Sequence, residues 1–447
     1  MKDIQNETHM KFTEFPQFGI LSGIKVVVTG INIAGPFAGC MMAEMGAQVI
    51  QIENPKMPCQ TRANYGFTQT HRNTFSMNLD IGSGRGAEVF EKLLTWADAW
   101  IESGRPGTYA KLGFPDERAW ELNPKLAIVH VSGYGQYGPD KDKAAYDVSG
   151  QAMSGYMYMN GAGPTAPPLR VNPYISDYVT AFNACNCCLS ILLHAKMTGQ
   201  GDAADVSQYE TMFRILDTYP MEWFNVGYPG PGEPVPYRSG NASQQAAGFS
   251  FYDCKDGILF VGMTGVGVVR RGYPLVGLPT PGSGEDPDFY ENMHGSKIDS
   301  PVGQRIDAAI AAFCAQYTVA EAEKIFNDNG IPNQRVFTPA DIEESPHFAA
   351  REDIITWEDS IFGTVRGIGI MNKFTRNPAQ VVSSAPTFGE HTREIVSNLG
   401  FSDAFIDEMF SAGEARIMTA EETARFWRFK ETGFFWSDEQ AKRLGIE

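Results

Sequence analysis

One acidic residue, Asp177, occupies a position where a carboxylate can act as a nucleophile. It lies in the stretch 172–178 (NPYISDY), and the apolar residues that follow, to about Lys196, predict a long buried helix. Unpaired backbone N–H groups and the helix dipole favour negative charge in the first turn of a helix, so we expect the Asp177 carboxylate to be ionised. An aspartate at such a place also commonly caps the helix, and the residue pattern leaves the capping role and the chemical role open.

Three glycines between a predicted strand and a predicted helix form a second candidate site. Gly30, Gly35 and Gly39 follow an apolar run, and Glu53 ends the next predicted strand, where a dinucleotide-binding protein has its ribose-binding acid. The dinucleotide fingerprint needs glycines two and then three residues apart, whereas the gaps here are five and four. The spacing disfavours a nicotinamide-dependent oxidoreductase. It leaves two interpretations, a phosphate or carboxylate site at a helix N-terminus and a tight strand–helix connection.

The elements that must position these residues alternate between strand and helix. The expected strands are 24–29, 47–52, 75–79, 99–101, 126–131 and 203–207, with helices from near Pro36 to Met45 and over 85–97. Such alternation predicts an open, mostly parallel α/β sheet with its ligand crevice at the carboxyl ends of the strands.

A second, α+β domain is expected beyond a cluster of Gly and Pro at 227–236 (GYPGPGEPVP). Strands at 249–254 and 258–263 predict a hairpin, residues 301–317 predict an amphipathic helix, and Thr318 with Glu321 predicts a capping box for the next helix. The expected division is a large domain over 1–226, a linker over 227–244, a small domain over 245–345, and a return into the large domain over 346–447.

Composition narrows the function classes. The chain has 447 residues, 36 Lys+Arg, 53 Asp+Glu and a net charge of −17, with no basic run, so nucleic acid is not an expected partner. No window resembles a membrane span, and the N-terminal stretch does not resemble a secretory signal, so we expect no membrane association. The seven cysteines indicate reduced thiols in the cytoplasm, and Cys185, Cys187 and Cys188 are interpreted as packing residues rather than as a metal site.

Motifs along nearly the whole chain resemble the class III CoA-transferases, the family of formyl-CoA and crotonobetainyl-CoA transferases. The matching stretches are 30–36 (GINIAGP), 45–53, 106–114, 123–126 (NPKL), 131–136 (VSGYGQ), 198–201 (TGQG), 345–351 and 385–392 (APTFGEHT). Other stretches are most similar to the branch that holds carnitine and bile-acid CoA-transferases, and most of all to the bile-acid enzymes: 15–19 (FPQFG), 65–66, 71–73, 146–147, 154–157 (SGYM), 172–174 and 262–265 (GMTG).

The resemblance implies a fold and a chemistry. The fold would be a large Rossmann-like α/β domain built from both ends of the chain, a smaller α+β domain inserted in it, and an interlocked homodimer. Asp177 would attack the thioester of an acyl-CoA donor, giving an aspartyl anhydride and then an aspartyl-CoA thioester. A carboxylic acid acceptor would then take the CoA. Coenzyme A would be the only cofactor, as acyl-CoA substrate, with no metal and no nicotinamide. The CoA contacts carried over are Ile33, Ala34, Asn54, Arg72, Asn73, Ser103, Gly104, Arg105, Lys111, Tyr134, Gly135 and Gln136.

The identity of the acceptor stays open at this stage. A bile acid would suit an apolar pocket, to which residues 153–159 (MSGYMYM) could contribute, although the same residues also fit one face of a core helix. A carnitine-like acid would suit a cage of Tyr156, Tyr158 and Tyr174. The family fold also hosts α-methylacyl-CoA racemases, but the His-Asp pair of those enzymes is Tyr146-Asp147 here, which makes a racemase the weaker alternative.

Overall fold

The computed structural model describes residues 2–3, 9–227, 238–243 and 246–426. Most of the expected linker and the aromatic C-terminal stretch that contains Phe434 and Trp436 lie outside these residues. The chain divides into two compact units: unit 1 comprises Met1–Ser154, Asn172–Ile215 and Ser345–Glu447, and unit 2 comprises Gly155–Val171 and Leu216–Glu344. The domain boundaries expected from the sequence stay a prediction.

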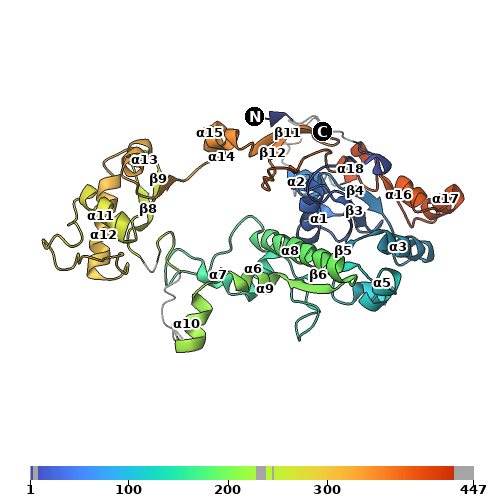
Figure 1. The fold of residues 1–447 in the computed structure, drawn as a ribbon, viewed down its shortest axis with the longest axis horizontal. Helices are drawn as coiled ribbons and strands as arrows, with labels where there is room; N and C mark the ends of the chain where they lie inside the picture. Colours follow the sequence, from blue (N-terminus) through green and yellow to red (C-terminus); the bar gives the residue numbers. More distant parts are fainter. Residues whose placement is uncertain (1, 4–8, 228–237, 244–245, 427–447) are drawn as a thin grey trace. The chain divides into compact units, whose positions relative to one another are not determined.

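A six-stranded parallel sheet forms the centre of unit 1 (Figure 1). Its strands are β2 (Lys25–Thr29), β3 (Gln48–Glu53), β4 (Phe75–Asn78), β5 (Ala99–Glu102), β6 (Ala127–Ser132) and β7 (Ala203–Ser207). The order is β4-β3-β2-β5-β6-β7 and every neighbouring pair is parallel. The predicted parallel α/β sheet is confirmed. The direction of winding reverses between β2 and β5, where such sheets open a crevice at their carboxyl edge.

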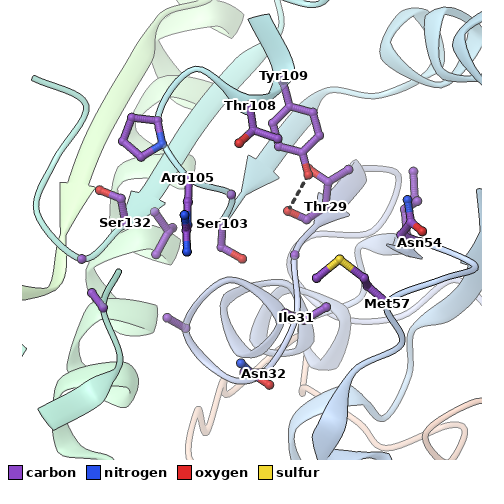
Figure 2. Close-up of a pocket in the computed structure, with 18 of the residues that line it drawn as sticks. Thr29, Ile31, Asn32, Asn54, Met57, Ser103, Arg105, Thr108, Tyr109 and Ser132 are labelled. Carbon is purple, nitrogen blue, oxygen red and sulfur yellow. Dashed lines mark hydrogen bonds between the residues drawn. The ribbon is translucent and has the colours of Figure 1, made fainter. Parts of the chain in front are cut away.

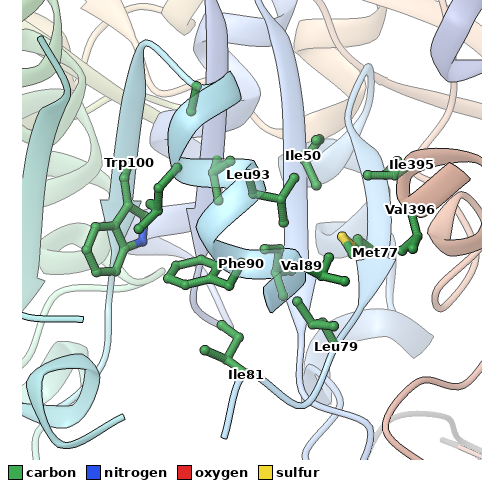
Figure 3. Packing of buried hydrophobic residues seen from close by; sticks show 14 of the residues in the cluster. Ile50, Met77, Leu79, Ile81, Val89, Phe90, Leu93, Trp100, Ile395 and Val396 are labelled. Atoms are coloured by element: carbon green, nitrogen blue, oxygen red, sulfur yellow. The ribbon is translucent and has the colours of Figure 1, made fainter. Parts of the chain in front are cut away.

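Helices cover both faces of this sheet, which explains why its strands are apolar without alternation. On β2, Val26 and Val28 pack in the cluster that includes α1 (Ala34–Glu44) and α8 (Ile175–Thr198). Val27 packs in the opposite cluster, with α3 (Gly84–Trp96) and α16 (Thr392–Asn398). Figure 3 shows Val89, Phe90 and Leu93 of α3 facing the sheet, with Ile395 and Val396 of α16 beside them. Residues more than 300 positions apart thus share one core.

The other elements of unit 1 lie around this sheet. They are the helices η1 (Phe12–Glu14), η2 (Gln60–Ala63), α2 (Tyr65–His71), α4 (Thr108–Lys111), α5 (Asp116–Leu122), α6 (Asp147–Met153), α9 (Gln208–Arg214), α15 (Pro346–Ala350), α17 (Asp403–Ser411) and α18 (Ala420–Phe426). A separate small sheet has the order β1-β11-β12, from Lys2–Asp3, Ile354–Asp359 and Gly363–Ile368.

Unit 2 has its own antiparallel sheet and core. Its strands β8 (Phe249–Asp253), β9 (Ile258–Gly262) and β10 (Asn333–Arg335) confirm the predicted hairpin, since Asp253 pairs with Ile258. Thr318 and Glu321 form the predicted capping box at the start of α13 (Val319–Asp328). The remaining helices are α7 (Tyr156–Met159), α10 (Tyr219–Val226), α11 (Val266–Leu275), α12 (Pro301–Cys314) and α14 (Pro339–Glu344).

Residues 153–159 do not form one helix. Helix α6 ends at Met153, and Gly155, with φ of 85°, separates it from α7. The two helices belong to different units. The interpretation of this segment as one face of a core helix is therefore wrong, because the left-handed backbone at Gly155 interrupts the helical hydrogen bonds.

Helix α8 is the one described helix that is long and apolar enough to cross a membrane by length and composition alone. It packs against α1, α9 and β6 of unit 1, and Figure 1 shows it lying across the sheet. Cys185 and Cys188 are buried in this packing and Cys187 is half-buried, so all three act as packing residues of α8.

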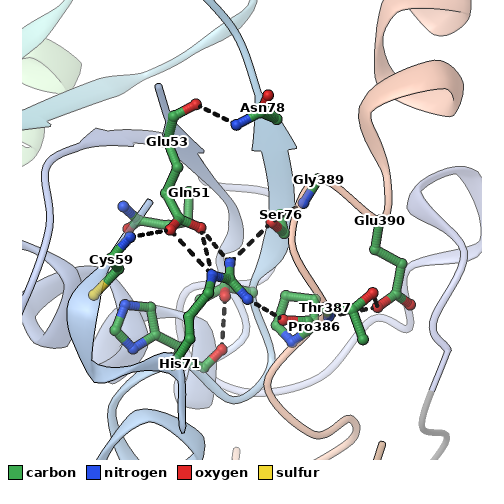
Figure 4. Close-up of polar contacts among 12 residues, drawn as sticks. Gln51, Glu53, Cys59, His71, Ser76, Asn78, Pro386, Thr387, Gly389 and Glu390 are labelled. Carbon is green, nitrogen blue, oxygen red and sulfur yellow. Dashed lines mark hydrogen bonds and ion pairs between the residues drawn. The ribbon is translucent and has the colours of Figure 1, made fainter. Parts of the chain in front are cut away.

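Polar side chains attach the C-terminal part of unit 1, here called the return segment (345–426), to the sheet. The Arg62 guanidinium pairs with the Glu53 carboxylate and donates to the Pro386 carbonyl oxygen at 2.8 Å and to the Ser76 hydroxyl at 3.2 Å. Figure 4 shows the Glu53 carboxylate with Cys59, Ser76 and Pro386 nearby. The His391 ring accepts from the Ser76 N–H at 3.1 Å and lies 2.8 Å from the Met10 carbonyl oxygen. His391 is the N-cap residue of α16 (Thr392–Asn398), but its side chain makes no capping hydrogen bond there.

Candidate active site

A pocket of about 560 Å³ opens at the carboxyl edge of the large sheet. Its walls are the turns that follow five successive strands, at residues 29–34, 52–54, 79–82, 103–106 and 131–133, together with Asp177 and Gln208. Figure 2 shows these turns converging, with the Tyr109 hydroxyl donating to the Thr29 carbonyl oxygen at 3.4 Å. The crevice predicted from the alternation of strands and helices is confirmed.

The glycines of the first turn serve close packing against Ser103. A Cβ atom at Gly30 would lie 1.8 Å from the Ser103 Oγ, and one at Gly35 would lie 2.9 Å from it. A Cβ atom at Gly39 would lie 2.6 Å from a Val28 methyl group. These contacts account for glycines at spacings that fit no dinucleotide fingerprint. The Ser103 hydroxyl is itself buried and has no hydrogen-bond partner among the described residues.

Asp177 lies in the first turn of α8, but Asp147 accepts the backbone N–H groups there. The Asp147 carboxylate accepts from the Ser176 N–H at 2.7 Å and from the Asp177 N–H at 3.2 Å. It also accepts from the Gln151 amide at 2.7 Å. Asp147, the first residue of α6, therefore caps the N-terminus of α8.

This arrangement changes the expected charge state of Asp177. Burial, followed by the nearby Asp147 carboxylate, raises the pKa of Asp177 to about 7, while a hydrogen bond from the Gln208 amide to Oδ1 acts in the opposite direction. The sequence pattern predicted an ionised carboxylate at this helix terminus, whereas burial and the second carboxylate both favour the neutral form. Near neutral pH the side chain is divided between its charged and neutral forms.

The mouth of the pocket is lined by basic side chains. Arg105, Lys141 and Lys143 all line it, and Lys143 also pairs with Asp140 at 2.8 Å. The two lysines were not expected as site residues. Their signal in the sequence is the KDK triplet at 141–143, four residues after the VSGYGQ stretch. In an acidic protein, three cations at one pocket mouth favour an anionic ligand.

The structure brings part of the expected CoA-binding set to this pocket. Six of the expected contacts line it together with Asp177: Ile33, Ala34, Asn54, Ser103, Gly104 and Arg105. Ile33 precedes α1 and makes no side-chain cap, so the first turn of this helix is exposed to the pocket without a capping side chain.

The other expected contacts do not line the pocket. Arg72 is buried against Glu44, at 2.6 Å from Nε to Oε1, and the Asn73 amide bonds to the return segment, with its Nδ2 donating to the Gln380 carbonyl oxygen at 2.6 Å. Both side chains fasten chain segments together. Lys111 is exposed on α4. The stretch 134–136 forms a tight turn held by Asp205, whose carboxylate accepts from the Gln136 N–H at 2.7 Å.

A buried charge cluster supports the turn that carries Ser103. His130 lies 2.7 Å from Glu102 and 3.1 Å from Asp116, and the other Glu102 oxygen accepts from the Gly104 N–H at 2.7 Å. Burial opposes charge on His130, but the hydrogen bonds that its ring donates to Asp116 and Glu102 outweigh it and raise the pKa of His130 to about 10. At the position of the racemase histidine, Tyr146 lines the pocket.

No cluster of three or more metal-ligating side chains occurs in the part of the chain that the structure describes.

Comparison with known proteins gives one family. The model of CoA-transferase family III matches residues 21–392. A bile acid CoA-transferase, BaiK of Clostridium scindens, is 46% identical over 420 residues, which is 93% of this chain and 94% of that protein.

Solved structures agree on the fold. A CAIB/BAIF family protein from Brucella suis superposes with a TM-score of 0.70 at 25% identity, over 86% of this chain and 100% of that one. The Rv3272 protein from Mycobacterium tuberculosis superposes with a TM-score of 0.72 at 21% identity, over 85% of this chain and 100% of that one.

Proposed function

The chain belongs to CoA-transferase family III, and we propose that it transfers coenzyme A from an acyl-CoA donor to a carboxylic acid through covalent intermediates on Asp177. The observation that carries the proposal is the place of Asp177. It is a half-buried carboxylate in the wall of a pocket whose mouth carries three cations. A carboxylate that is poorly solvated and not paired with a cation is a stronger nucleophile than a solvated one.

The reaction proceeds by exchange of acyl bonds at the Asp177 carboxyl group. Oδ2 attacks the thioester carbonyl carbon of the donor, and the C–S bond breaks to give a mixed anhydride and the CoA thiolate. The thiolate attacks Cγ of Asp177, and the donor acid leaves with its electron pair. The acceptor carboxylate then attacks the aspartyl-CoA thioester, and the same two steps run in reverse. Since the pKa of Asp177 is about 7, a large fraction of the side chain carries the charge needed for the first attack.

The basic residues bind the phosphates of CoA in this proposal. Arg105 suits bidentate contacts with a phosphate, and Lys141 and Lys143 supply further charge at the mouth. Ser103 and Gly104 line the same pocket. The proposal also includes a homodimer in the cytoplasm. Sedimentation of the purified chain as a monomer at micromolar concentration would contradict the dimer.

The acceptor in the proposal is a bile acid. Its support is the 46% identity, over nearly the full length of both chains, to a protein named as a bile acid CoA-transferase. A screen tests this point, with cholyl-CoA as donor and a panel of acids that contains deoxycholate, carnitine and short hydroxy acids. We expect new thioester by mass spectrometry with deoxycholate. Transfer to carnitine or to a hydroxy acid alone would replace the acceptor and leave the transferase assignment intact.

Trapping of the intermediate tests the role of Asp177. With acyl-CoA and hydroxylamine together, we expect a hydroxamate at Asp177 in the peptide map. We expect Asp177→Ala to lower turnover about 1,000-fold or more, because the nucleophile is lost. Asp202→Asn is the matched control, since Asp202 is an exposed aspartate outside the pocket. Wild-type turnover by Asp177→Ala, or exchange of the acyl α-proton without any acceptor, would overturn the proposal.

A further inference from the structure

Gln208 is the one side chain that donates a hydrogen bond to Asp177 among the residues that the structure describes. Its Nε2 donates to Asp177 Oδ1. The backbone N–H groups at the start of α8 are directed to Asp147, so they do not stabilise the Asp177 carboxylate. The side chain of Gln208 is 7% exposed and lines the pocket. The amide is therefore a desolvated donor at one defined oxygen of the nucleophile.

The position of Gln208 is fixed by close packing. Gln208 begins α9, directly after β7, and the Ser207 hydroxyl caps this helix by accepting from the Glu210 N–H at 3.3 Å. Helix α6 approaches from the other side at Gly150, where a Cβ atom would lie 3.0 Å from the Gln208 Cβ and 2.3 Å from the Ser176 Oγ. A side chain at Gly150 would clash with the Ser176 hydroxyl and press on the Cβ of Gln208. Close packing of α6, α8 and α9 thus holds the base of the Gln208 side chain in place.

We infer that Gln208 is a positioning residue for the transfer reaction, which orients Asp177 so that Oδ2 attacks and stabilises the charge that forms on Oδ1. This inference depends on the proposed function. In the mixed anhydride, Oδ2 is the bridging oxygen and Oδ1 is the carbonyl oxygen. When the CoA thiolate attacks Cγ, the carbonyl electron pair moves to Oδ1, next to the Gln208 N–H. The pair returns to the C–O bond as the donor carboxylate leaves. The same N–H serves each later attack on the aspartyl carbonyl.

The hydrogen bond from Gln208 can be tested through its effect on the pKa of Asp177, because the other groups near Asp177 are known. Asp147 approaches from α6, Tyr178 lies next to it on α8, and the neutral Gln208 comes from α9. Gln208 is the group that favours the ionised form, so its loss raises the pKa of Asp177 further. A variant without this amide is expected to show a slower reaction and an acid limb of the pH–rate profile displaced to higher pH. A purely structural role for Gln208 would not move that limb.

The test is formation of the aspartyl-CoA thioester in a single turnover of the full-length enzyme with cholyl-CoA, or with crotonobetainyl-CoA if the wild type uses that donor. We expect Gln208→Met to slow this step about 10- to 100-fold, with a change in the Kd for CoA below about threefold. Gln208→Glu keeps the shape but places a carboxyl group against Asp177, so the acid limb should move further in the same direction. It also provides the test if Gln208→Met folds poorly.

Gln48→Met is the matched control. The Gln48 amide donates one hydrogen bond, to the Phe12 carbonyl oxygen at 2.8 Å. Gln48 lies at the amino end of β3, whereas the pocket lies at the carboxyl ends of the strands. Its rate and pH profile should equal those of the wild type. Unchanged rates and an unchanged acid limb in both Gln208 variants, with Asp177→Ala inactive, would overturn the inference and leave the proposed function standing. Thioester formation by Asp177→Ala would overturn both.

Discussion

The fold provides opposite surroundings for two carboxylates at the carboxyl edge of the large sheet. Glu53 is buried with Arg62, whose Nε lies 3.0 Å from each carboxylate oxygen, and Oε1 also accepts from the Cys59 N–H at 2.8 Å. Asp177 has the Asp147 carboxylate beside it and the neutral amide of Gln208 as its donor. The first carboxylate is matched by a cation, and the second is not.

The difference separates a structural charge from a reactive one. A buried carboxylate that is fully paired has no lone pair to spare and holds chain segments in place. A carboxylate that is desolvated and placed next to another negative charge has a raised pKa, and such groups concentrate at sites of chemistry. The same functional group, a carboxylate, thus serves stability at Glu53 and reactivity at Asp177. Three substitutions test this contrast.

Removing the Arg62 cation, the partner of Glu53, should have the largest effect on the free energy of unfolding. Arg62→Met leaves the Glu53 carboxylate buried without its partner and removes the bonds to Pro386 and Ser76. We expect the free energy of unfolding, measured by urea denaturation, to fall by about 3 to 5 kcal/mol. Arg393→Met, which breaks an exposed pair with Asp407, should cost less than about 1 kcal/mol. Equal losses in the two variants would contradict the structural role of the buried pair.

Replacing Asp177, the carboxylate without a cationic partner, by a neutral residue should stabilise the protein. The pKa of Asp177 in the folded state, about 7, lies above its ordinary value of 3.8, so the folded state holds a proton that the unfolded state has released. Wild-type stability therefore falls as pH rises from about 4 to 7, and the penalty is complete above that range. We expect the free energy of unfolding of Asp177→Asn to exceed that of the wild type by about 4 kcal/mol near pH 8, with little difference near pH 4. A gap that does not depend on pH would show that Asp177 is not the titrating group.

Removing the neighbouring charge should have the smallest effect on stability and a clear effect on pH dependence. In Asp147→Asn, the side-chain oxygen still accepts from the Ser176 and Asp177 N–H groups, so α8 keeps its cap. The pKa of Asp177 should move down toward its ordinary value because the like charge is gone. The acid limb of the pH–rate profile should move to lower pH, and the urea midpoint should change little. An unmoved acid limb would mean that burial alone sets the pKa.

Local patterns in the sequence predicted the strands, the crevice at their carboxyl ends, and the place of Asp177 in the first turn of a long helix. Apolar runs such as 24–29 mark buried strands, and their alternation with helices predicts a parallel sheet with its crevice at that edge. These features need only short stretches of chain. The chemical role of Asp177 came from resemblance to the family. The prediction that the unit containing this sheet takes up both ends of the chain came from resemblance to the family.

The features that the sequence did not predict depend on distant contacts. Nothing near Asp177 in the sequence indicates that Asp147 takes the helix N–H groups, since the two are 30 residues apart. Gln208, which donates a hydrogen bond to Asp177, lies 31 residues after it in the sequence. Arg72 has the residue type of a phosphate ligand, but its partner Glu44 comes from α1 and buries it. Side-chain pairing across elements decides these roles, and local pattern does not report it.

The fastening of the return segment has a consequence for the order in which the protein is synthesised. The acceptor for one Arg62 nitrogen, the Pro386 carbonyl, is made 324 residues after Arg62 itself, and His391 follows Ser76 by 315. While the ribosome adds unit 2, the β4 edge of the emerged sheet lacks α16 and its apolar residues Ile395 and Val396. The nascent large unit therefore keeps part of its apolar core exposed until α16 is made, and exposed apolar surface of this kind favours aggregation during folding.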